Sequence, residues 1–295
     1  MSKIAFEGSW VALVTPFIDG KIDCDGLSKL LDLHLDCGTD GIVVCGTTAE
    51  SPTLSTDEKE FLMEFVAKRV SGRIPLMFGT GGNNTSSAVL LTKRAKDLGA
   101  DAVLVVTPYY NKPTQGGLVS HFQCIAKATS LPVVLYNVPG RTGVNMLAKT
   151  TIELSKEGNI KAVKEASGNL DQMMDIISNA PAGFSLLSGD DAITLPIMAL
   201  GGRGVISVSG NVAPREVKKL VSLALAGNWS GARDQHYKLL ELNRAMFIET
   251  NPIPAKAALS MLGLIRDECR LPLVPAQPGT KAELKKILVQ MGLLS

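Results

Sequence analysis

The sequence predicts an α/β protein: a (β/α)8 barrel with a small C-terminal all-helical appendage. Three observations predict this fold. Short apolar runs alternate with longer amphipathic segments, the alternation occurs eight times, and only helical patterns follow Gly227. Strands that are buried on both faces and joined by helices form parallel sheets. Eight such units are the number that a closed barrel contains.

The individual strands and helices are predicted from hydrophobic periodicity. The predicted strands are Val11–Thr15, Gly41–Cys45, Pro75–Gly79, Ala102–Thr107, Pro132–Tyr136, Ile160–Ala166, Phe184–Ser188 and Val205–Val208. The predicted helices between and after them are Asp25–Cys37, Thr56–Val70, Thr85–Leu98, Gly116–Thr129, Met146–Glu157, Leu170–Asn179, Ala192–Leu200 and Pro214–Ala226. Ser55 ahead of two acidic residues, and Pro214 ahead of Glu216, are typical helix starts.

The C-terminal part has a different pattern. We expect a barrel over residues 1–227 and a helical domain over 228–295, with helices Ser230–Ile248, Ala255–Leu262 and Lys281–Met291. Asn251-Pro252-Ile253-Pro254 separates the first two, because proline interrupts helices. None of these residues is predicted to take part in chemistry. An open doubly wound sheet is the alternative fold, but the turn after the first strand lacks the glycine pattern of a dinucleotide site.

Composition excludes several classes of function. Apolar residues make up 45% of the 295, and the net charge is only +2, so neither nucleic acid nor an anionic membrane is an expected partner. No apolar run approaches the ~18 residues that a membrane span needs. Five cysteines without a C-x-x-C, and no signal-like N-terminus, lead us to expect a cytoplasmic protein. Three histidines at unrelated positions predict no metal site.

Lys164 is the residue of greatest interest. Alternation along Ile160–Ala166 places Ala162, Lys164 and Ala166 on one face of the strand, with Glu165 on the other. Lys164 thus stands between two small side chains, near the strand end at which barrel enzymes keep their chemistry. A lysine removed from water there could lose its proton and attack a carbonyl. A solvated lysine at a strand end is the alternative.

Other strand ends carry hydroxyls, one arginine and few acids. The turn Gly46-Thr47-Thr48 could bind a carboxylate through its N–H groups and hydroxyls, and Arg141 could bind a second one. This set suits a small anionic carbonyl compound, and it lacks the acid pair of glycoside hydrolysis. The alternatives are a simple turn, a surface arginine and, for Tyr136, a core position. Asp190-Asp191 stands alone and could equally cap a helix.

Five segments together resemble the pyruvate-dependent class I aldolases of the dihydrodipicolinate synthase and N-acetylneuraminate lyase family. They are Gly46-Thr47-Thr48-Ala49-Glu50-Ser51, Thr107-Pro108-Tyr109-Tyr110-Asn111, Tyr136-Asn137-Val138-Pro139-Gly140-Arg141-Thr142-Gly143, Lys164-Glu165-Ala166 and Leu187-Ser188-Gly189-Asp190-Asp191. The resemblance covers nearly the whole chain, and it implies a Schiff-base lyase that needs no cofactor.

The resemblance also implies roles for single residues. Lys164 would form a Schiff base with pyruvate, and Tyr136, Thr47 and Tyr110 would form a proton relay, with Tyr110 supplied across a subunit interface. Thr48 would hold the pyruvate carboxylate. The remaining substrate-binding positions are Arg141, for the carboxylate of L-aspartate 4-semialdehyde, and Ile206, through its backbone. This is the condensation of the diaminopimelate route to lysine, and the family is commonly a homotetramer built as a dimer of dimers.

Arg141 and the pair Tyr109-Tyr110 favour the synthase over sibling aldolases that cleave sugar acids. Those siblings, and a non-catalytic barrel, remain alternatives. Ala49 stands where relatives commonly have glycine, which costs freedom if the position needs a positive φ. At the positions where lysine-inhibited relatives tend to carry a histidine and an acid, this chain has Lys59, Thr56 and Ser87. We therefore expect weak or absent feedback by lysine.

Overall fold

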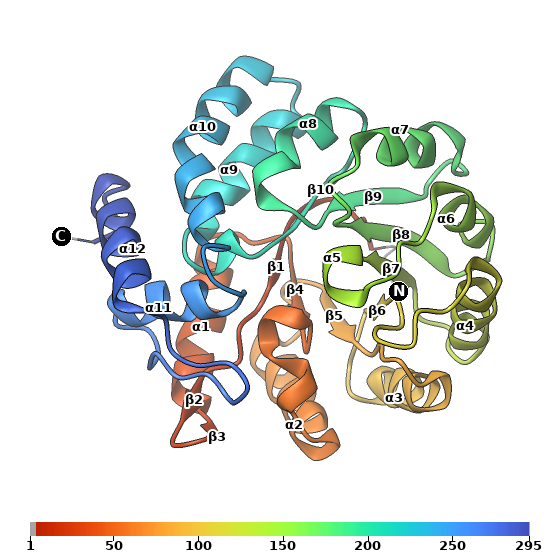
Figure 1. The fold of residues 1–295 in the computed structure, drawn as a ribbon, viewed down its shortest axis with the longest axis horizontal. Helices are drawn as coiled ribbons and strands as arrows, with labels where there is room; N and C mark the ends of the chain where they lie inside the picture. The colour runs from red at the N-terminus through yellow and green to blue at the C-terminus, as the bar shows by residue number, and fades with distance from the viewer. Residues whose placement is uncertain (1–3, 295) are drawn as a thin grey trace.

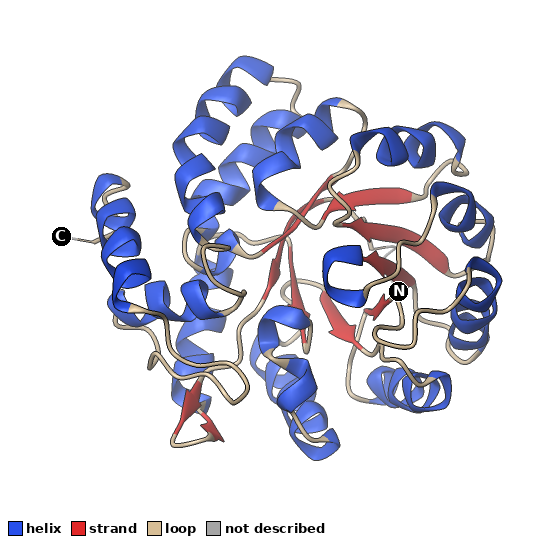
Figure 2. Cartoon of the chain, in the orientation of Figure 1, coloured by secondary structure: helices blue, strands red, loops and turns tan. Residues whose placement is uncertain are grey.

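The computed structural model describes residues 4–294 and has eight parallel strands closed into a barrel, with helices around it (Figures 1 and 2). Around the barrel the strands follow the order β1, β10, β9, β8, β7, β6, β5 and β4. Their bounds are β1 Gly8–Ala12, β4 Gly41–Val44, β5 Leu76–Gly79, β6 Ala102–Val106, β7 Val133–Asn137, β8 Ile160–Glu165, β9 Ser185–Ser188 and β10 Gly204–Ser207. The predicted closed barrel is confirmed.

Each barrel strand is followed by a helix. These are α1 Cys24–Asp36, α2 Thr56–Val70, α3 Thr85–Asp97, α4 Gln115–Lys127, α6 Ala148–Leu154, α7 Leu170–Asn179, α8 Thr194–Ala199 and α9 Pro214–Leu225, with the single turn α5 Pro139–Thr142 ahead of α6. The Ser55 cap of α2 is a full capping box with Glu58, because each side chain bonds the other's backbone N–H. A small hairpin of β2 Phe17–Ile18 and β3 Lys21–Ile22 was not predicted. Its turn is Asp19-Gly20, both left-handed.

The barrel closes where β1 meets β10, and there the prediction was wrong by three residues. The predicted strand began at Val11, whereas the pairing runs from Gly8 against Gly204 to Val11 against Ser207. Beyond Ala12 the chain stays buried outside the ladder, and the N–H of Val14 donates to Asn211 Oδ1 at 3.1 Å. Gly204 has φ 149°, and a β-carbon there would overlap the Gly8 carbonyl. The seam therefore requires glycine at Gly204.

Apolar side chains form two separate clusters. The larger lies between the barrel and the surrounding helices and includes Val163. The smaller fills the barrel interior and includes Trp10, Ala162, Leu187 and Ile206. Val163 thus faces the helices and Ala162 faces the interior, as the predicted alternation requires. The interior layers of a barrel are packed side chains, so chemistry is confined to the strand ends.

Three helices follow the eighth unit: α10 Trp229–Ala245, α11 Ile253–Met261 and α12 Pro278–Gln290. They lie together on one side of the barrel, at the blue end of the chain in Figure 1. α10 packs against α9, and α12 packs against α10 and α11. The helical appendage is confirmed. The boundary at residue 227 stays a prediction, supported by the left-handed Gly227 that ends α9.

A buried ion pair fastens this appendage to the barrel. Lys256 of α11 pairs with Glu50 of the turn after β4, and neither side chain is exposed at all. Lys256 Nζ also donates to the Glu268 carbonyl at 2.7 Å, and the Arg270 N–H donates to Glu50 Oε2 at 2.8 Å. The Phe17 ring lies 4.1 Å from the lysine nitrogen. Burial lowers the pKa of Lys256, and the Glu50 carboxylate opposes that shift.

Removing the lysine should therefore cost much more stability than removing a surface cation. We expect Lys256→Met to lower the free energy of unfolding by about 3–5 kcal/mol, because Glu50 would be left buried and unpaired. The matched control is Arg69→Met, whose pair with Asp32 is 45% exposed on both sides and should cost at most about 1 kcal/mol. Urea unfolding at one fixed protein concentration measures both. Equal losses would contradict this account.

Candidate active site

The structure places the predicted residues at one end of the barrel. Thr47 and Thr48 lie in the short 3-10 turn that follows β4, Tyr110 follows β6, Tyr136 lies in β7, Arg141 in α5, Lys164 in β8 and Ile206 in β10. In parallel sheets the carboxyl ends of all strands meet at one edge, which explains how residues so far apart in the sequence converge. The single turn of α5 lies over the barrel in Figure 1.

Lys164 is buried, with 4% of its surface exposed. Its Nζ lies 4.3 Å from the centre of the Tyr136 ring, and the two residues are direct partners in the ladder between β7 and β8. Among residues 4–294 no carboxylate forms an ion pair with this amine. The reading of Lys164 as a solvated surface lysine is therefore wrong.

Small residues that follow β8 and β9 leave space beside Lys164. Gly189, after β9, is among them, and sequence reasoning gave it no role. A β-carbon at Gly189 would lie 2.7 Å from the Ala166 β-carbon and 3.2 Å from Lys164 Cε. Its N–H donates to the Glu165 carbonyl at 2.7 Å, which fixes this close approach. The signal available in the sequence was a glycine directly after an apolar strand.

Glu165, on the opposite face of β8, holds the end of that strand. Its carboxylate is buried and accepts hydrogen bonds from Asn137 Nδ2 at 3.1 Å, Gln172 Nε2 at 3.2 Å and the Ser167 N–H at 2.7 Å. Burial raises the pKa of the Glu165 carboxyl, and these donors oppose the rise. Glu165 thus links β7, β8 and α7 directly behind Lys164.

The turn after β4 has an unusual backbone. Cys45 (φ 57°) and Glu50 (φ 55°) are left-handed, a conformation that non-glycine residues seldom adopt. Ala49 is not among the left-handed residues, so the alanine costs no backbone freedom at this position. Thr15 Oγ1 donates to the Ala49 carbonyl at 2.9 Å, and Glu50 is held by Lys256. The turn that presents Thr47 and Thr48 is therefore held at its C-terminal end.

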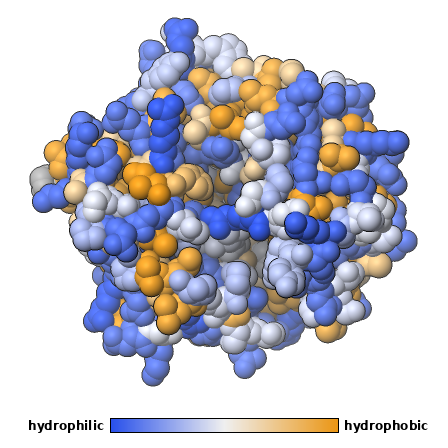
Figure 3. All heavy atoms as spheres, viewed as in Figure 1, coloured by the Kyte–Doolittle hydropathy of each residue, from blue (hydrophilic) through white to orange (hydrophobic). Residues whose placement is uncertain are grey.

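A cavity of about 280 Å³ opens at this end of the barrel. Its walls include Thr47, Lys59, Tyr109, Tyr136 and Arg141. Lys164, Thr48 and Ile206 are buried and do not form its wall, but Tyr136 joins the cavity to the Lys164 amine. The surface on this side of the molecule is mostly hydrophilic, with small scattered hydrophobic groups (Figure 3). The volume suits small polar substrates.

The appendage also reaches this site, which the sequence reasoning missed. Asn251 Nδ2 donates to Thr48 Oγ1 at 3.0 Å, and the Asn251 carbonyl accepts from Arg141 Nη2 at 3.2 Å. The sequence analysis expected no C-terminal residue in the chemistry, and it did not predict that one of them contacts two candidate site residues. A signal existed in the break Asn251-Pro252-Ile253-Pro254. Periodicity identifies such a break as an interruption and does not show what it touches.

Tyr110 lies apart from the other predicted residues. Its side chain is 90% exposed, it has a left-handed backbone (φ 72°), and it does not line the cavity. Its neighbour Tyr109 lines the cavity instead. The structure thus brings Thr47, Tyr136 and Arg141 together and directs Tyr110 outward.

The two consecutive aspartates are structural. Asp190 caps the turn before α8 by accepting from the Ala192 N–H at 2.9 Å. Asp191 is buried, accepts from Ser207 Oγ and from the Val208 N–H at 2.8 Å, and burial raises the pKa of its carboxyl. Within the described residues no group of three or more histidine, cysteine, aspartate or glutamate side chains could hold a metal ion. No described helix is long and apolar enough to span a membrane.

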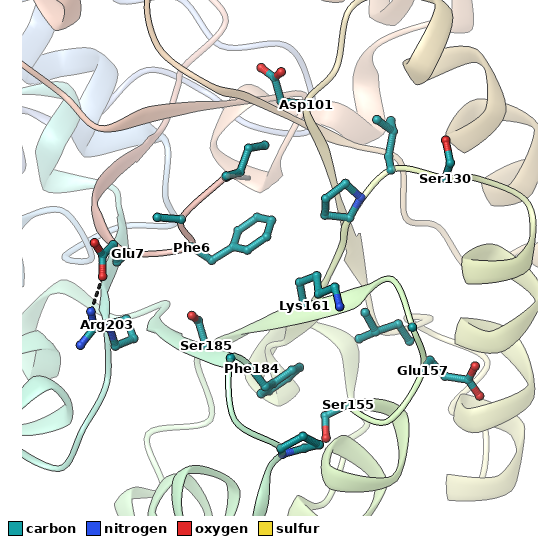
Figure 4. Close-up of a pocket in the computed structure, with 18 of the residues that line it drawn as sticks. Phe6, Glu7, Asp101, Ser130, Ser155, Glu157, Lys161, Phe184, Ser185 and Arg203 are labelled. Atoms are coloured by element: carbon teal, nitrogen blue, oxygen red, sulfur yellow. Dashed lines mark hydrogen bonds and ion pairs between the residues drawn. The ribbon is translucent and has the colours of Figure 1, made fainter. Parts of the chain in front are cut away.

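A larger cavity, about 1130 Å³, lies at the opposite end of the barrel (Figure 4). Phe6, Lys161 and Phe184 line it, and Glu7 and Arg203 form an ion pair at its edge. These residues precede or begin the strands, where barrel enzymes do not place their chemistry. Size alone therefore does not identify the active site here.

Comparisons with known proteins match nearly the whole chain to one family. The sequence profile of the dihydrodipicolinate synthetase family matches residues 5–291. The 4-hydroxy-tetrahydrodipicolinate synthase of Aquifex aeolicus is 50% identical over 289 residues, covering 98% of each chain, and that of Parabacteroides distasonis is 50% identical over 295, covering 99% of each. The crystal structure of the Aquifex aeolicus protein superposes with a TM-score of 0.96, covering 98% of this chain and 99% of its own.

A closed (β/α)8 barrel with a buried lysine near a cavity at its carboxyl end, in a chain about 50% identical to these synthases, is a barrel lyase of the class I aldolase type. The chain belongs to the dihydrodipicolinate synthetase family. Its activity is that of a 4-hydroxy-tetrahydrodipicolinate synthase, an enzyme of lysine and diaminopimelate biosynthesis. The family resemblance and the predicted activity are thus confirmed, and these comparisons lend no support to the sugar-acid aldolase or to the non-catalytic barrel.

Gly189→Ala should impair the lysine without unfolding the barrel. The added methyl would press on Ala166 and Lys164 Cε, and displacing a reacting group by about 1 Å can cost ~100-fold in rate. We expect kcat to fall about 10- to 100-fold, measured in steady state. Gly116→Ala is the matched control, since a β-carbon there meets nothing within 4 Å. Wild-type kcat in Gly189→Ala would contradict the steric argument.

Proposed function

We propose that the enzyme condenses pyruvate with L-aspartate 4-semialdehyde through a Schiff base at Lys164. The observation that supports this most is a buried amine, without an acid partner, 4.3 Å from the ring of a tyrosine that lines the cavity. An amine in such surroundings is a suitable nucleophile toward a ketone. No metal is required, because the imine itself accepts the electron pair.

The proposed reaction has three stages. Lys164 Nζ attacks the pyruvate carbonyl, and loss of water gives the imine. Loss of a methyl proton then gives the enamine, whose carbon attacks the aldehyde of the second substrate. Finally the amine of that substrate attacks the imine carbon, releases Lys164 and closes the ring. Protons move at each stage, which calls for a hydroxyl relay beside the amine.

We assign that relay to Tyr136, Thr47 and Tyr110. Tyr136 and Thr47 share the cavity wall, and Tyr136 contacts the amine. Thr48 is assigned to the pyruvate carboxylate, Arg141 to the carboxylate of the semialdehyde, and Ile206 to the site wall through its backbone. A guanidinium suits a carboxylate because it can donate two parallel hydrogen bonds.

We further propose that the enzyme acts as a homo-oligomer, a tetramer built as a dimer of dimers. Tyr110 supports this, because its side chain is exposed and does not line the cavity of its own chain. A 44% identical solved structure with a TM-score of 0.97 is described as the first monomeric dihydrodipicolinate synthase variant. Calling a monomeric form a variant implies that the unmodified form of that enzyme is an oligomer. We also propose a cytoplasmic location, which the five free cysteines favour.

Borohydride trapping tests the Schiff base. We expect reduction in the presence of pyruvate to attach one pyruvate-derived group to Lys164, identified by peptide mass mapping. Lys164→Met should lose the adduct and nearly all activity. Lys161→Met removes an exposed lysine from the same strand and should retain both. An active enzyme whose Lys164 carries no adduct would refute the mechanism.

Feedback by lysine should be weak or absent. Lys59 lines the cavity wall, while Thr56 and Ser87 are exposed at the starts of α2 and α3. A cation at Lys59 repels a lysine ammonium, and Ser87 offers no carboxylate to attract it. Steady-state rates with rising free lysine measure the effect. Half-inhibition at submillimolar lysine would contradict the prediction.

A further inference from the structure

Asn251, between α10 and α11, makes contacts that its place in the appendage does not explain. It is buried, yet its side chain donates to Thr48 Oγ1 at 3.0 Å and its carbonyl accepts from Arg141 at 3.2 Å. We propose that Asn251 is a positioning residue that turns the Thr48 hydroxyl into a hydrogen-bond donor toward the pyruvate carboxylate. This inference rests on the proposed function.

The direction of the Thr48 proton follows from what a hydroxyl can donate and accept. A threonine hydroxyl has one proton to donate and can accept hydrogen bonds on its oxygen. The Asn251 amide donates to that oxygen, and because the amide is itself the donor, the Thr48 proton must be directed elsewhere. A carboxylate can only accept hydrogen bonds. The contact therefore leaves the Thr48 proton available for another acceptor, and a substrate carboxylate is such an acceptor.

Stability does not account for Asn251. Its Oδ1 atom is buried without a hydrogen-bond partner among residues 4–294, and an unmatched buried acceptor is unfavourable. An apolar side chain of similar size would avoid this cost. The Asn251 amide donates to Thr48 despite this cost, and that contact is the one to which we assign its role.

The two contacts of Asn251 come from different parts of the residue. The side chain reaches Thr48, whereas the backbone carbonyl reaches Arg141. Truncating the side chain removes only the first contact. The truncation should accordingly raise KM for pyruvate, the ligand assigned to Thr48. It should leave KM for the semialdehyde, the ligand assigned to Arg141, unchanged.

The test is a steady-state comparison of Asn251→Ala with wild type. We expect KM for pyruvate to rise about 10- to 100-fold, as for loss of a hydrogen bond to a charged group. KM for the semialdehyde, and trapping of pyruvate at Lys164 at saturating concentration, should be unchanged. Asn243→Ala is the matched control. Asn243 is also a buried appendage asparagine with an unpartnered Oδ1, but its amide donates to the Asp191 carbonyl.

A double-mutant cycle with Thr48→Val identifies the route of the effect. If Asn251 acts through the Thr48 hydroxyl, Asn251→Ala should raise KM for pyruvate in the otherwise wild-type enzyme and not in the enzyme that already carries Thr48→Val. Additive effects would overturn the inference. Should Asn251→Ala fail to fold, Asn251→Asp keeps the shape while replacing the donor by an acceptor, and it should show the same selective rise.

The remaining outcomes are distinct. An unchanged KM for pyruvate in Asn251→Ala or Asn251→Asp, or an equal rise in Asn243→Ala, overturns the inference while leaving the Schiff base intact. Loss of borohydride trapping in the wild-type enzyme overturns the proposed function itself. Equal rises for both substrates would mean that Asn251 supports the site as a whole, which also contradicts the selective role.

Discussion

The ion pair between Lys256 and Glu50 lies wholly inside the protein and joins the appendage to the turn after β4. Glu50 is left-handed at that point, so its backbone is costly to hold and needs outside support. Support comes from three directions: the lysine, the Arg270 N–H and the Thr15 hydroxyl one residue earlier. Two buried charges gain little net stability by pairing, although breaking such a pair is expensive. The main contribution of the pair is therefore to fix the position of the turn after β4.

The barrel supplies the other half of the site by a different principle. β7 and β8 carry Tyr136 and Lys164 side by side, and the rigid ladder fixes their separation. On the opposite face of β8, Glu165 accepts hydrogen bonds from Asn137, Ser167 and Gln172 and so links the strand ends without pairing with the Lys164 amine. Small residues provide room on the inner face, and Gly189 does so through a backbone contact that leaves no space for a methyl group. The sheet therefore positions the strand residues Tyr136 and Lys164, whereas the turn that carries Thr48 is held by contacts with the appendage.

This difference explains what the sequence could predict. Period-two alternation determines which face of β8 Lys164 occupies, and the eight-unit count places that strand in a closed barrel, so both were predicted correctly. The start of β1 was wrong because the run Val11–Thr15 is as apolar as a strand, while pairing is set by the close approach of Gly8 and Gly204. Asn251 was missed because its partner Thr48 is 203 residues away. Periodicity carries no information about contacts at that range.

Tyr110 and Asn251 extend the same reasoning to the assembled enzyme. Neither belongs to the barrel strands, and each bears on the site from outside, one proposed to come from a neighbouring subunit and the other from the appendage. A (β/α)8 barrel alone would offer the amine, Tyr136 and an unsupported threonine turn. Binding a small anion then requires that hydroxyl protons point inward, since a carboxylate can only accept hydrogen bonds. Asn251 of the appendage meets this requirement, because it donates to the Thr48 oxygen and leaves the Thr48 proton for the substrate. The appendage thus contributes to anion binding as well as to packing.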